Sequence, residues 1–307
     1  MLLNFAPHRR LPTILALGCC FIVNFLPANE LAAQSPVWKV SCGDHTLFLG
    51  GTCHLLRAKD YPLPEAFEQA YQKADRLVFE VSPEELQDPS AMARMMQAGV
   101  YPENQSLRDV LEPEVFASLA EQGLRRNLPI FLLESFKPGL AVMMLTMQEL
   151  VLQGINEEGV DLHFSNRAST DGKPTEGLET ITFQIDLICE MGTGYENDFV
   201  RYSMDDLEKL GDMIHPLLDA WRIGDTSRLE ELFLKDLQRY PKLYNDLVVA
   251  RNQRWLEQIE QFLENSETEF ILVGFGHLVG EDGLIELLRS RNCTVEYVST
   301  KALALGI

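Results

Sequence analysis

The sequence is short of basic residues. It has 26 lysines and arginines against 46 aspartates and glutamates, which gives a formal net charge of −20. A protein that binds nucleic acid needs a basic face for the phosphates, so this balance argues against a DNA or RNA partner. Much of the negative charge falls on stretches that we predict to be helical, where it favours a solvated and soluble surface.

The motifs of several enzyme classes are also missing. We find no G-x-S-x-G elbow, P-loop, H-E-x-x-H helix or Rossmann glycine fingerprint. Cysteine is scarce and forms no C-x-x-C pair, which excludes a zinc ribbon and a disulfide-stapled scaffold. We interpret Cys42, Cys53, Cys189 and Cys293 as buried thiols and leave one disulfide open. Cys53 lies beside His54, but successive side chains at a strand end point apart, so it is a weak candidate nucleophile.

A long hydrophobic run occurs at the amino terminus. Arg9-Arg10 precedes an apolar stretch from Leu11 to Leu26, and small residues follow up to Ala33. This order predicts a secretory signal peptide over residues 1–33, and therefore a secreted or periplasmic protein. A membrane contact would then require an uncleaved signal or lipidation at Cys19; leucine directly before Gly18 disfavours the second alternative.

No segment rich in proline, glycine or serine divides the rest of the chain. We predict one α/β domain over residues 36–307 with a mixed sheet. Strands Trp38–Cys42 and His45–Leu49 form a hairpin around Gly43-Asp44. A helix over Glu65–Ala74 and a strand over Arg76–Val81 follow, as in a parallel crossover.

The middle of the chain, about 83–263, reads as a large helical insertion. One short strand within it is expected to end at Leu178-Glu179. The methionine clusters at 92–96 and 143–147 have helical spacing, and we interpret them as core filler rather than as an adaptable binding surface. The candidate helices are Pro83–Ala98, Pro113–Asn127, Gly139–Gln153, Val160–Ser169, Thr180–Glu190, Met204–Ile223, Thr226–Phe233 and Leu243–Leu263.

One pattern occurs twice, near the two ends of the domain. LFLGGTCHLL (Leu47–Leu56) and FILVGFGHLV (Phe270–Val279) both read as an apolar strand, a glycine and then a histidine three residues later. The second copy is followed by a predicted helix and strand, as the first is. We therefore predict a sheet made of two related β-GxxH-α-β halves. Because ligands bind at the carboxyl ends of such strands, His54 and His277 are expected to share one site.

These residues suggest a metal centre. Neutral imidazoles and a carboxylate are ligands for zinc, manganese, cobalt or iron. We assign His54 and His277 as ligands and Glu80 as a third ligand or as the general base. Glu179 is a second candidate for either role. The structural alternative is that each histidine only makes loop hydrogen bonds and that Glu80 pairs with an arginine such as Arg251.

The order of short motifs resembles that of the TraB/GumN family, which includes the Tiki proteins. The matching stretches are Gly51-Thr52-Cys53-His54, the strand with Glu80, Gln105–Asp109, Lys137-Pro138, Gly159-Val160-Asp161, Gly177–Thr180 with Gln184, Trp221 with Gly224-Asp225, Arg251-Asn252 and Gly274–His277. Family members often carry tryptophan after Lys-Pro, whereas Gly139 stands there in this sequence. The missing aromatic removes one side chain expected to line the cleft.

The resemblance implies a metal-dependent hydrolase related to the Tiki-type metalloproteases, with His54, His277 and Glu80 in the active site. The implied cofactor is a divalent ion such as Mn, Co or Zn, and the implied substrate is a peptide or protein. Glu179 and Arg251 would support or orient the reacting groups. The superfamily is also similar to erythromycin-esterase-like and haem-binding ChaN-like proteins. The alternative is therefore a non-catalytic protein that binds haem, metal or peptide in the same cleft.

Overall fold

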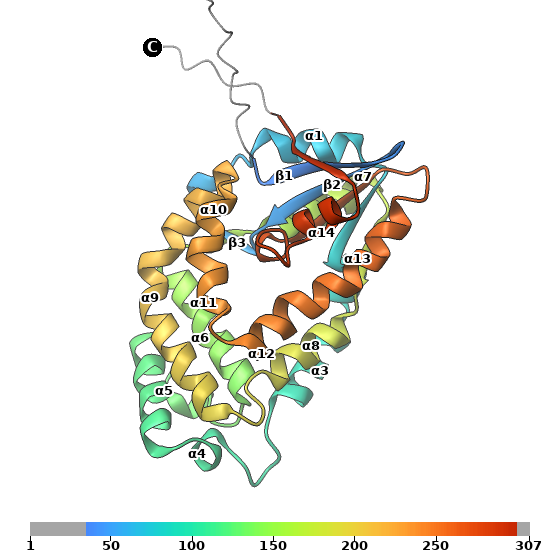
Figure 1. The fold of residues 1–307 in the computed structure, drawn as a ribbon. Helices are drawn as coiled ribbons and strands as arrows, with labels where there is room; N and C mark the ends of the chain where they lie inside the picture. The colour runs from blue at the N-terminus through green and yellow to red at the C-terminus, as the bar shows by residue number, and fades with distance from the viewer. Residues whose placement is uncertain (1–34, 300–307) are drawn as a thin grey trace, which may run out of the picture. The chain divides into compact units, whose positions relative to one another are not determined.

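A computed structural model describes residues 35–299, and Figure 1 shows their arrangement. The predicted signal peptide lies outside the described residues. The sheet has six strands in the order β6-β4-β7-β2-β1-β8. Their bounds are β1 Val37–Cys42, β2 His45–Thr52, β4 Arg76–Val81, β6 Thr175–Glu179, β7 Glu269–Gly274 and β8 Thr294–Tyr297.

The sheet is mixed, as predicted. The pairs β6–β4, β4–β7 and β7–β2 are parallel, whereas β1 is antiparallel to both β2 and β8. The hairpin between β1 and β2 turns at Gly43, which has φ +59°. This left-handed conformation suits a residue without a side chain, so the turn forms where the sequence predicts it.

Strands that follow one another in the sequence are not always neighbours in the sheet. Strand β4 is parallel to β2, but β7 from the far end of the sequence lies between them. Residues Phe270 to Val273 of β7 are fully buried, as expected for a central strand covered on both faces. The two GxxH segments thus interleave within one sheet, and the carboxyl ends of β2, β7 and β4 become neighbours. That the two halves are related copies stays a prediction.

Helices cover both faces of the sheet. On one face, α1 (Glu65–Lys73) contributes Phe67 and α7 (Val160–Asp171) contributes Phe164, and both rings contact Phe270 of β7. On the other face, α14 (Leu284–Ser290) lies in front of β2 and beside α13 (Ala250–Phe262) (Figure 1). These layers bury the sheet and leave its strand ends as the accessible edge.

The middle of the chain is mostly helical. Helices α5, α6 and α9 run alongside one another beyond the edge of the sheet (Figure 1). The remaining elements between β4 and β7 are α2 (Pro83–Gln87), α3 (Pro89–Gly99), α4 (Leu107–Val110), α5 (Pro113–Arg125), η2 (Ile130–Leu132), α6 (Pro138–Leu152), β5 (Glu157–Glu158), α8 (Ile181–Glu190), α9 (Glu196–Ile223), α10 (Thr226–Leu229), the π-helical turn η3 (Glu230–Leu234), α11 (Lys235–Leu237), α12 (Pro241–Tyr244) and the π-helical turn η4 (Asn245–Val249).

Two helix boundaries differ from the prediction. The predicted helix over Pro83–Ala98 is two helices, because Asp88 caps a new start and Pro89 occupies its first turn. Proline suits a helix start but lacks the N–H that a helix interior requires. Helix α9 begins at Glu196, eight residues before the predicted Met204, and it continues through Pro216. Within residues 35–299, no helix is both long and apolar enough to cross a membrane.

Position 139 has no room for a side chain, because helices α6 and α8 pack closely there. Gly139 begins α6 directly beneath α8, and a Cβ at this position would collide with the carbonyl oxygen of Ile188. A tryptophan after Pro138 would therefore require α8 to move.

The interpretation of all four cysteines as free thiols is wrong for one pair. Cys42, at the end of β1, forms a disulfide with Cys293, directly before β8. Cys53 and Cys189 are free, and burial raises the pKa of Cys53 well above its usual value. A buried thiol that resists ionisation is a poor nucleophile, in line with the low weight given to Cys53.

Replacing both Cys42 and Cys293 by serine is expected to lower the free energy of unfolding by about 2–5 kcal/mol, because the bond closes a loop of 251 residues. Urea unfolding measures the change. Wild-type protein unfolded in reducing agent is the control and should match the variant. Alkylation of all four thiols in unreduced, denatured protein would show that the bond does not form.

Candidate functional site

His277 is buried and held by hydrogen bonds. It closes the short turn η5 (Phe275–His277) after β7, and only 7% of its surface is exposed. Its Nδ1 lies 2.7 Å from the side-chain oxygen of Asn252, which can only accept, so Nδ1 carries the proton. Nε2 then accepts a hydrogen bond from Arg251 at 2.9 Å. Burial lowers the pKa of His277 to about 3, so the ring is neutral at physiological pH.

Glu80 stands at the end of the neighbouring strand β4 and is also buried. One carboxylate oxygen accepts from the backbone N–H of Gly274 at 2.8 Å, and the other accepts from Arg251 at 2.6 Å and from Gln184 at 3.0 Å. Burial alone would raise the pKa of Glu80, but the charge of Arg251 acts together with the two imidazoles and the N–H of Gly274 and lowers the pKa to about 2. Glu80 is therefore a fixed anion.

Arg251, on α13, joins these groups. One of its terminal nitrogens lies 2.6 Å from an oxygen of Glu80 and 2.6 Å from an oxygen of Glu179. Glu179, at the end of β6, also accepts from the indole of Trp255 at 3.2 Å. The side chains of Arg251, Glu80 and Glu179 are about nine-tenths buried or more. Two carboxylates and one guanidinium thus form a buried network that the imidazole of His277 completes.

His54 lies at the open side of the site. Its side chain is 71% exposed, and its Nδ1 lies 2.9 Å from a carboxylate oxygen of Asp161. The charge of Asp161 raises the pKa of His54 to about 9. Gly159 brings the start of α7 against the end of β2, because a Cβ there would collide with the carbonyl oxygens of Cys53 and His54. This close approach is what places Asp161 beside the ring.

The two GxxH histidines are therefore not equivalent, contrary to the superposition of their sequences. After β2 the chain continues into β3 (Leu55–Leu56), which pairs with β5, whereas after β7 it turns tightly back. The local pattern is repeated, but one histidine is solvated and charged while the other is buried and neutral.

One cavity of about 390 Å³ brings the predicted residues together. His54, Glu80, Arg251 and His277 all line it, along with the backbone of Gly274. Glu179 does not line this cavity and lies behind Arg251, which it holds. The sequence prediction of a shared site thus agrees with the arrangement of these side chains, while their chemical roles stay predictions.

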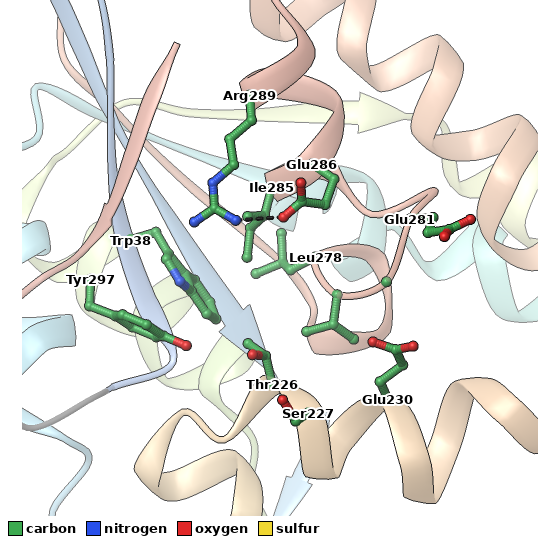
Figure 2. A pocket seen from close by; sticks show the side chains of 12 residues that line it. Trp38, Thr226, Ser227, Glu230, Leu278, Glu281, Ile285, Glu286, Arg289 and Tyr297 are labelled. Atoms are coloured by element: carbon green, nitrogen blue, oxygen red, sulfur yellow. Dashed lines mark hydrogen bonds and ion pairs between the residues drawn. The ribbon is translucent and has the colours of Figure 1, made fainter. Parts of the chain in front are cut away.

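A separate cavity of about 240 Å³ lies beyond the loop that follows His277. Figure 2 shows Trp38 and Tyr297 on one side of it and Glu230 and Glu281 on the other, with Arg289 paired to Glu286 above. None of the predicted site residues lines this cavity. It is a different hollow on the far side of Leu278, and we assign it no part in the site.

The types of donor atom in the site, two imidazoles and one carboxylate, are those that bind divalent cations. Asp161 and Asn252 engage the Nδ1 atoms of the two histidines, so Nε2 is the nitrogen of each ring that could face an ion, once His54 loses the proton that its raised pKa retains at neutral pH. This is how proteins orient metal-binding histidines. Within the described part of the chain, however, no three His, Cys, Asp or Glu side chains lie close enough to hold a metal ion. In the present arrangement Arg251 occupies Nε2 of His277 and one oxygen of Glu80.

Sequence reasoning did not assign roles to several residues that position the site. Asn252 orients His277, Asp161 orients His54, and Gln184 bridges Glu80 and Glu179. A signal for Asn252 was available: it follows Arg251 directly on a helix whose next apolar positions are buried. A polar pair on a buried helix face requires partners in the interior.

Comparisons with known proteins give a family match and a distant relative. The family model described as TraB/PrgY/gumN family matches residues 36–297, which include every residue of the site. The chain is similar to the protein named Metalloprotease TIKI1 from Danio rerio, with 23% identity over 88% of this chain. The match covers 64% of that relative's length, so the chain spans somewhat less than two thirds of it. No solved structure matches the chain significantly.

Replacing Arg251 by methionine is expected to lower the free energy of unfolding by about 3–5 kcal/mol, because Glu80 and Glu179 would stay buried without a cation. Urea unfolding in the presence of chelator measures this. Arg201→Met is the matched control: its pair with Glu112 is half-exposed, so a change of no more than about 0.5 kcal/mol is expected. Equal stability of the two variants would contradict the network.

Replacing Asp161 by asparagine is expected to lower the pKa of His54 from about 9 toward 6.5, because the carboxylate charge is lost. In wild-type protein, the stability that this pair contributes is present below pH 6.5 and is lost as the pH rises through about 9. NMR titration of the imidazole in metal-free protein measures the pKa. Asp171→Asn, at the other end of α7, should leave it unchanged, and an unchanged value in Asp161→Asn would disprove the contact.

Proposed function

The chain belongs to the TraB/PrgY/gumN family, and from this premise we propose that it is a hydrolase that cleaves peptide bonds with a divalent metal ion. The observation that carries the proposal is the single cavity shared by His54, His277 and Glu80, each from the end of a different strand of one sheet. The similarity to a protein named as a metalloprotease supports the choice of peptide bonds.

We propose His54, His277 and Glu80 as the residues that would hold the ion. Two imidazoles and a carboxylate suit manganese, cobalt or zinc and leave positions for water and substrate. A bound ion of this kind would polarise the scissile carbonyl and make water more acidic. For His277 to serve as a ligand, the N–H of Arg251 would have to leave Nε2.

The other residues of the cluster have roles that follow from their contacts. Both oxygens of Glu80 already accept hydrogen bonds from the protein, which favours a fixed anion over a mobile proton acceptor. Arg251 is the cation nearest to Glu80 and His277, and its N–H groups can orient a carbonyl oxygen once they are released. Glu179 keeps the guanidinium in place through three contacts.

The site of action that we propose is outside the cytoplasm. The signal peptide expected over residues 1–33 would direct export. The Cys42–Cys293 disulfide supports this, since such bonds persist mainly in oxidising compartments such as the periplasm.

The second candidate function is binding without catalysis. The cavity has apolar walls, among them Leu150, Ile155, Leu218 and Phe275, which would suit haem or an apolar peptide. In that case the histidines would act as ligands for a bound group, and no substrate would be cleaved.

Replacing His54 or His277 by alanine is expected to reduce metal-dependent peptide hydrolysis by about 100-fold or more, because each removes a ligand. Cleavage of a peptide library, followed by mass spectrometry, measures this after chelation and after addition of Mn, Co or Zn. His163→Ala is the matched control, since His163 lies outside the cavity, and it should keep full activity.

Full metal-dependent activity in His54→Ala or His277→Ala would refute the assignment. No hydrolysis with any of these ions, combined with binding of haem or metal that both variants lose, would favour the binding protein instead.

A further inference from the structure

The cavity of the site adjoins a groove between helices. A second cavity of about 420 Å³ adjoins it, and the two share a wall of apolar side chains that includes Met147 of α6, Leu217 of α9 and Phe233 of η3. The same side chains line both cavities, so the second cavity is a neighbouring groove on the side of α6 and α9. We call it the helical groove.

The apolar side chains of the helical groove are accessible. Met147 is 42% exposed and Phe233 is 37% exposed. Met143 lies deeper in the same groove. The interpretation of the methionine clusters as core filler is therefore wrong for Met147, and also for Met92 and Met96 of the first cluster, which are 66% and 44% exposed. Methionine is flexible and polarisable and suits a surface that accepts apolar side chains of different shapes.

A third cavity lies on the other side of the site. His54 and Glu80 also line this hollow of about 310 Å³, together with Leu86 of α2 and Leu162 of α7, which are 54% and 51% exposed. His54 and Glu80 thus line both this hollow and the cavity of about 390 Å³, and both spaces have apolar walls. A ligand that fills both spaces must pass across His54 and Glu80.

The charges along the three cavities do not favour a free carboxyl terminus. Among the described residues that line them, Arg251 is the one lysine or arginine, and both of its carboxylate partners are close. The carboxylates that line the far end of the helical groove, Asp206 and Asp236, would repel an acidic side chain. The apolar side chains around Met147 and Phe233 therefore fit an apolar side chain better than an acidic one.

We propose that the substrate is an extended polypeptide segment, cleaved at an internal bond, with a large apolar side chain in the helical groove. This inference rests on the proposed function and specifies its substrate class. The scissile bond lies against His54 and Glu80, and the chain on its other side contacts Leu86 and Leu162. Burial of one large aliphatic or aromatic side chain in the groove supplies the preference.

The test uses full-length mature protein and peptides with acetylated amino and amidated carboxyl termini. Matched peptides carry Leu, Met or Phe at one position, or Ser or Asp there instead. We expect the apolar peptides to have a kcat/KM at least about 10-fold higher than the polar peptides. Met147→Gln is expected to reduce this preference several-fold, because it places an amide in the groove at similar volume.

The matched control for Met147→Gln is Leu152→Gln. Leu152 lies on the same helix, is 49% exposed and lines none of the three cavities. The Leu152→Gln variant should therefore prefer apolar over polar peptides to the same extent as the wild type. Met147→Trp should fill the groove and shift the preference toward alanine. Circular dichroism and thermal unfolding establish that each variant is folded.

Equal cleavage of polar and apolar peptides, or equal effects of Met147→Gln and Leu152→Gln, would overturn the proposal. Cleavage of peptides with free termini but not of blocked peptides would overturn the internal bond. If no peptide is cleaved with any metal, the proposed function fails, and the groove is tested by itself. A dansyl-labelled, leucine-containing blocked peptide should then bind to the wild type and to Leu152→Gln but not to Met147→Gln, and equal binding by all three would refute the groove.

Discussion

The arrangement of the site depends on one buried guanidinium. Arg251 contacts Glu80 at the end of β4, Glu179 at the end of β6 and His277 after β7, so it joins three strand ends to helix α13. Removing these charges from water is costly, and only close pairing repays that cost. The pairs therefore restrict how the strand ends and α13 can move relative to one another. A network of this kind fixes the geometry of a site before any ligand arrives.

The same network makes the two histidines chemically different. His277 lies inside it, neutral, with its proton fixed on Nδ1 by Asn252. His54 lies at its open edge and depends on Asp161 for orientation. A ligand that enters the cavity would meet His54 first and would reach His277 only by competing with Arg251. Arg251 therefore controls access to the inner histidine.

The helical segment between β4 and β7 contributes more than cover for the sheet. It supplies α13, with Arg251 and Asn252, and it supplies the apolar walls on both sides of His54 and Glu80. Exposure of the methionine and leucine side chains in these walls to water is unfavourable in free energy. An apolar ligand that covers them would recover that free energy. The residues proposed to react come from the ends of the strands, and the apolar walls of the cavities come mainly from the helices.

Short-range patterns in the sequence predicted most of the local elements and the candidate residues that line the cavity. Apolar strands followed by glycine and histidine, the hairpin turn at Gly43, and the carboxylates at the ends of β4 and β6 are local patterns, and each lies where it was predicted. The tertiary structure decided what depends on distant contacts. Arg251 lies 171 residues from Glu80 in the chain, and the insertion of β7 between β2 and β4 joins opposite ends of the sequence. Whether a histidine is buried or solvated is set by the packing of remote helices around it, so two identical GxxH patterns gave two different environments. The physical reason is that backbone preferences act over a few residues, whereas burial and charge pairing act through space.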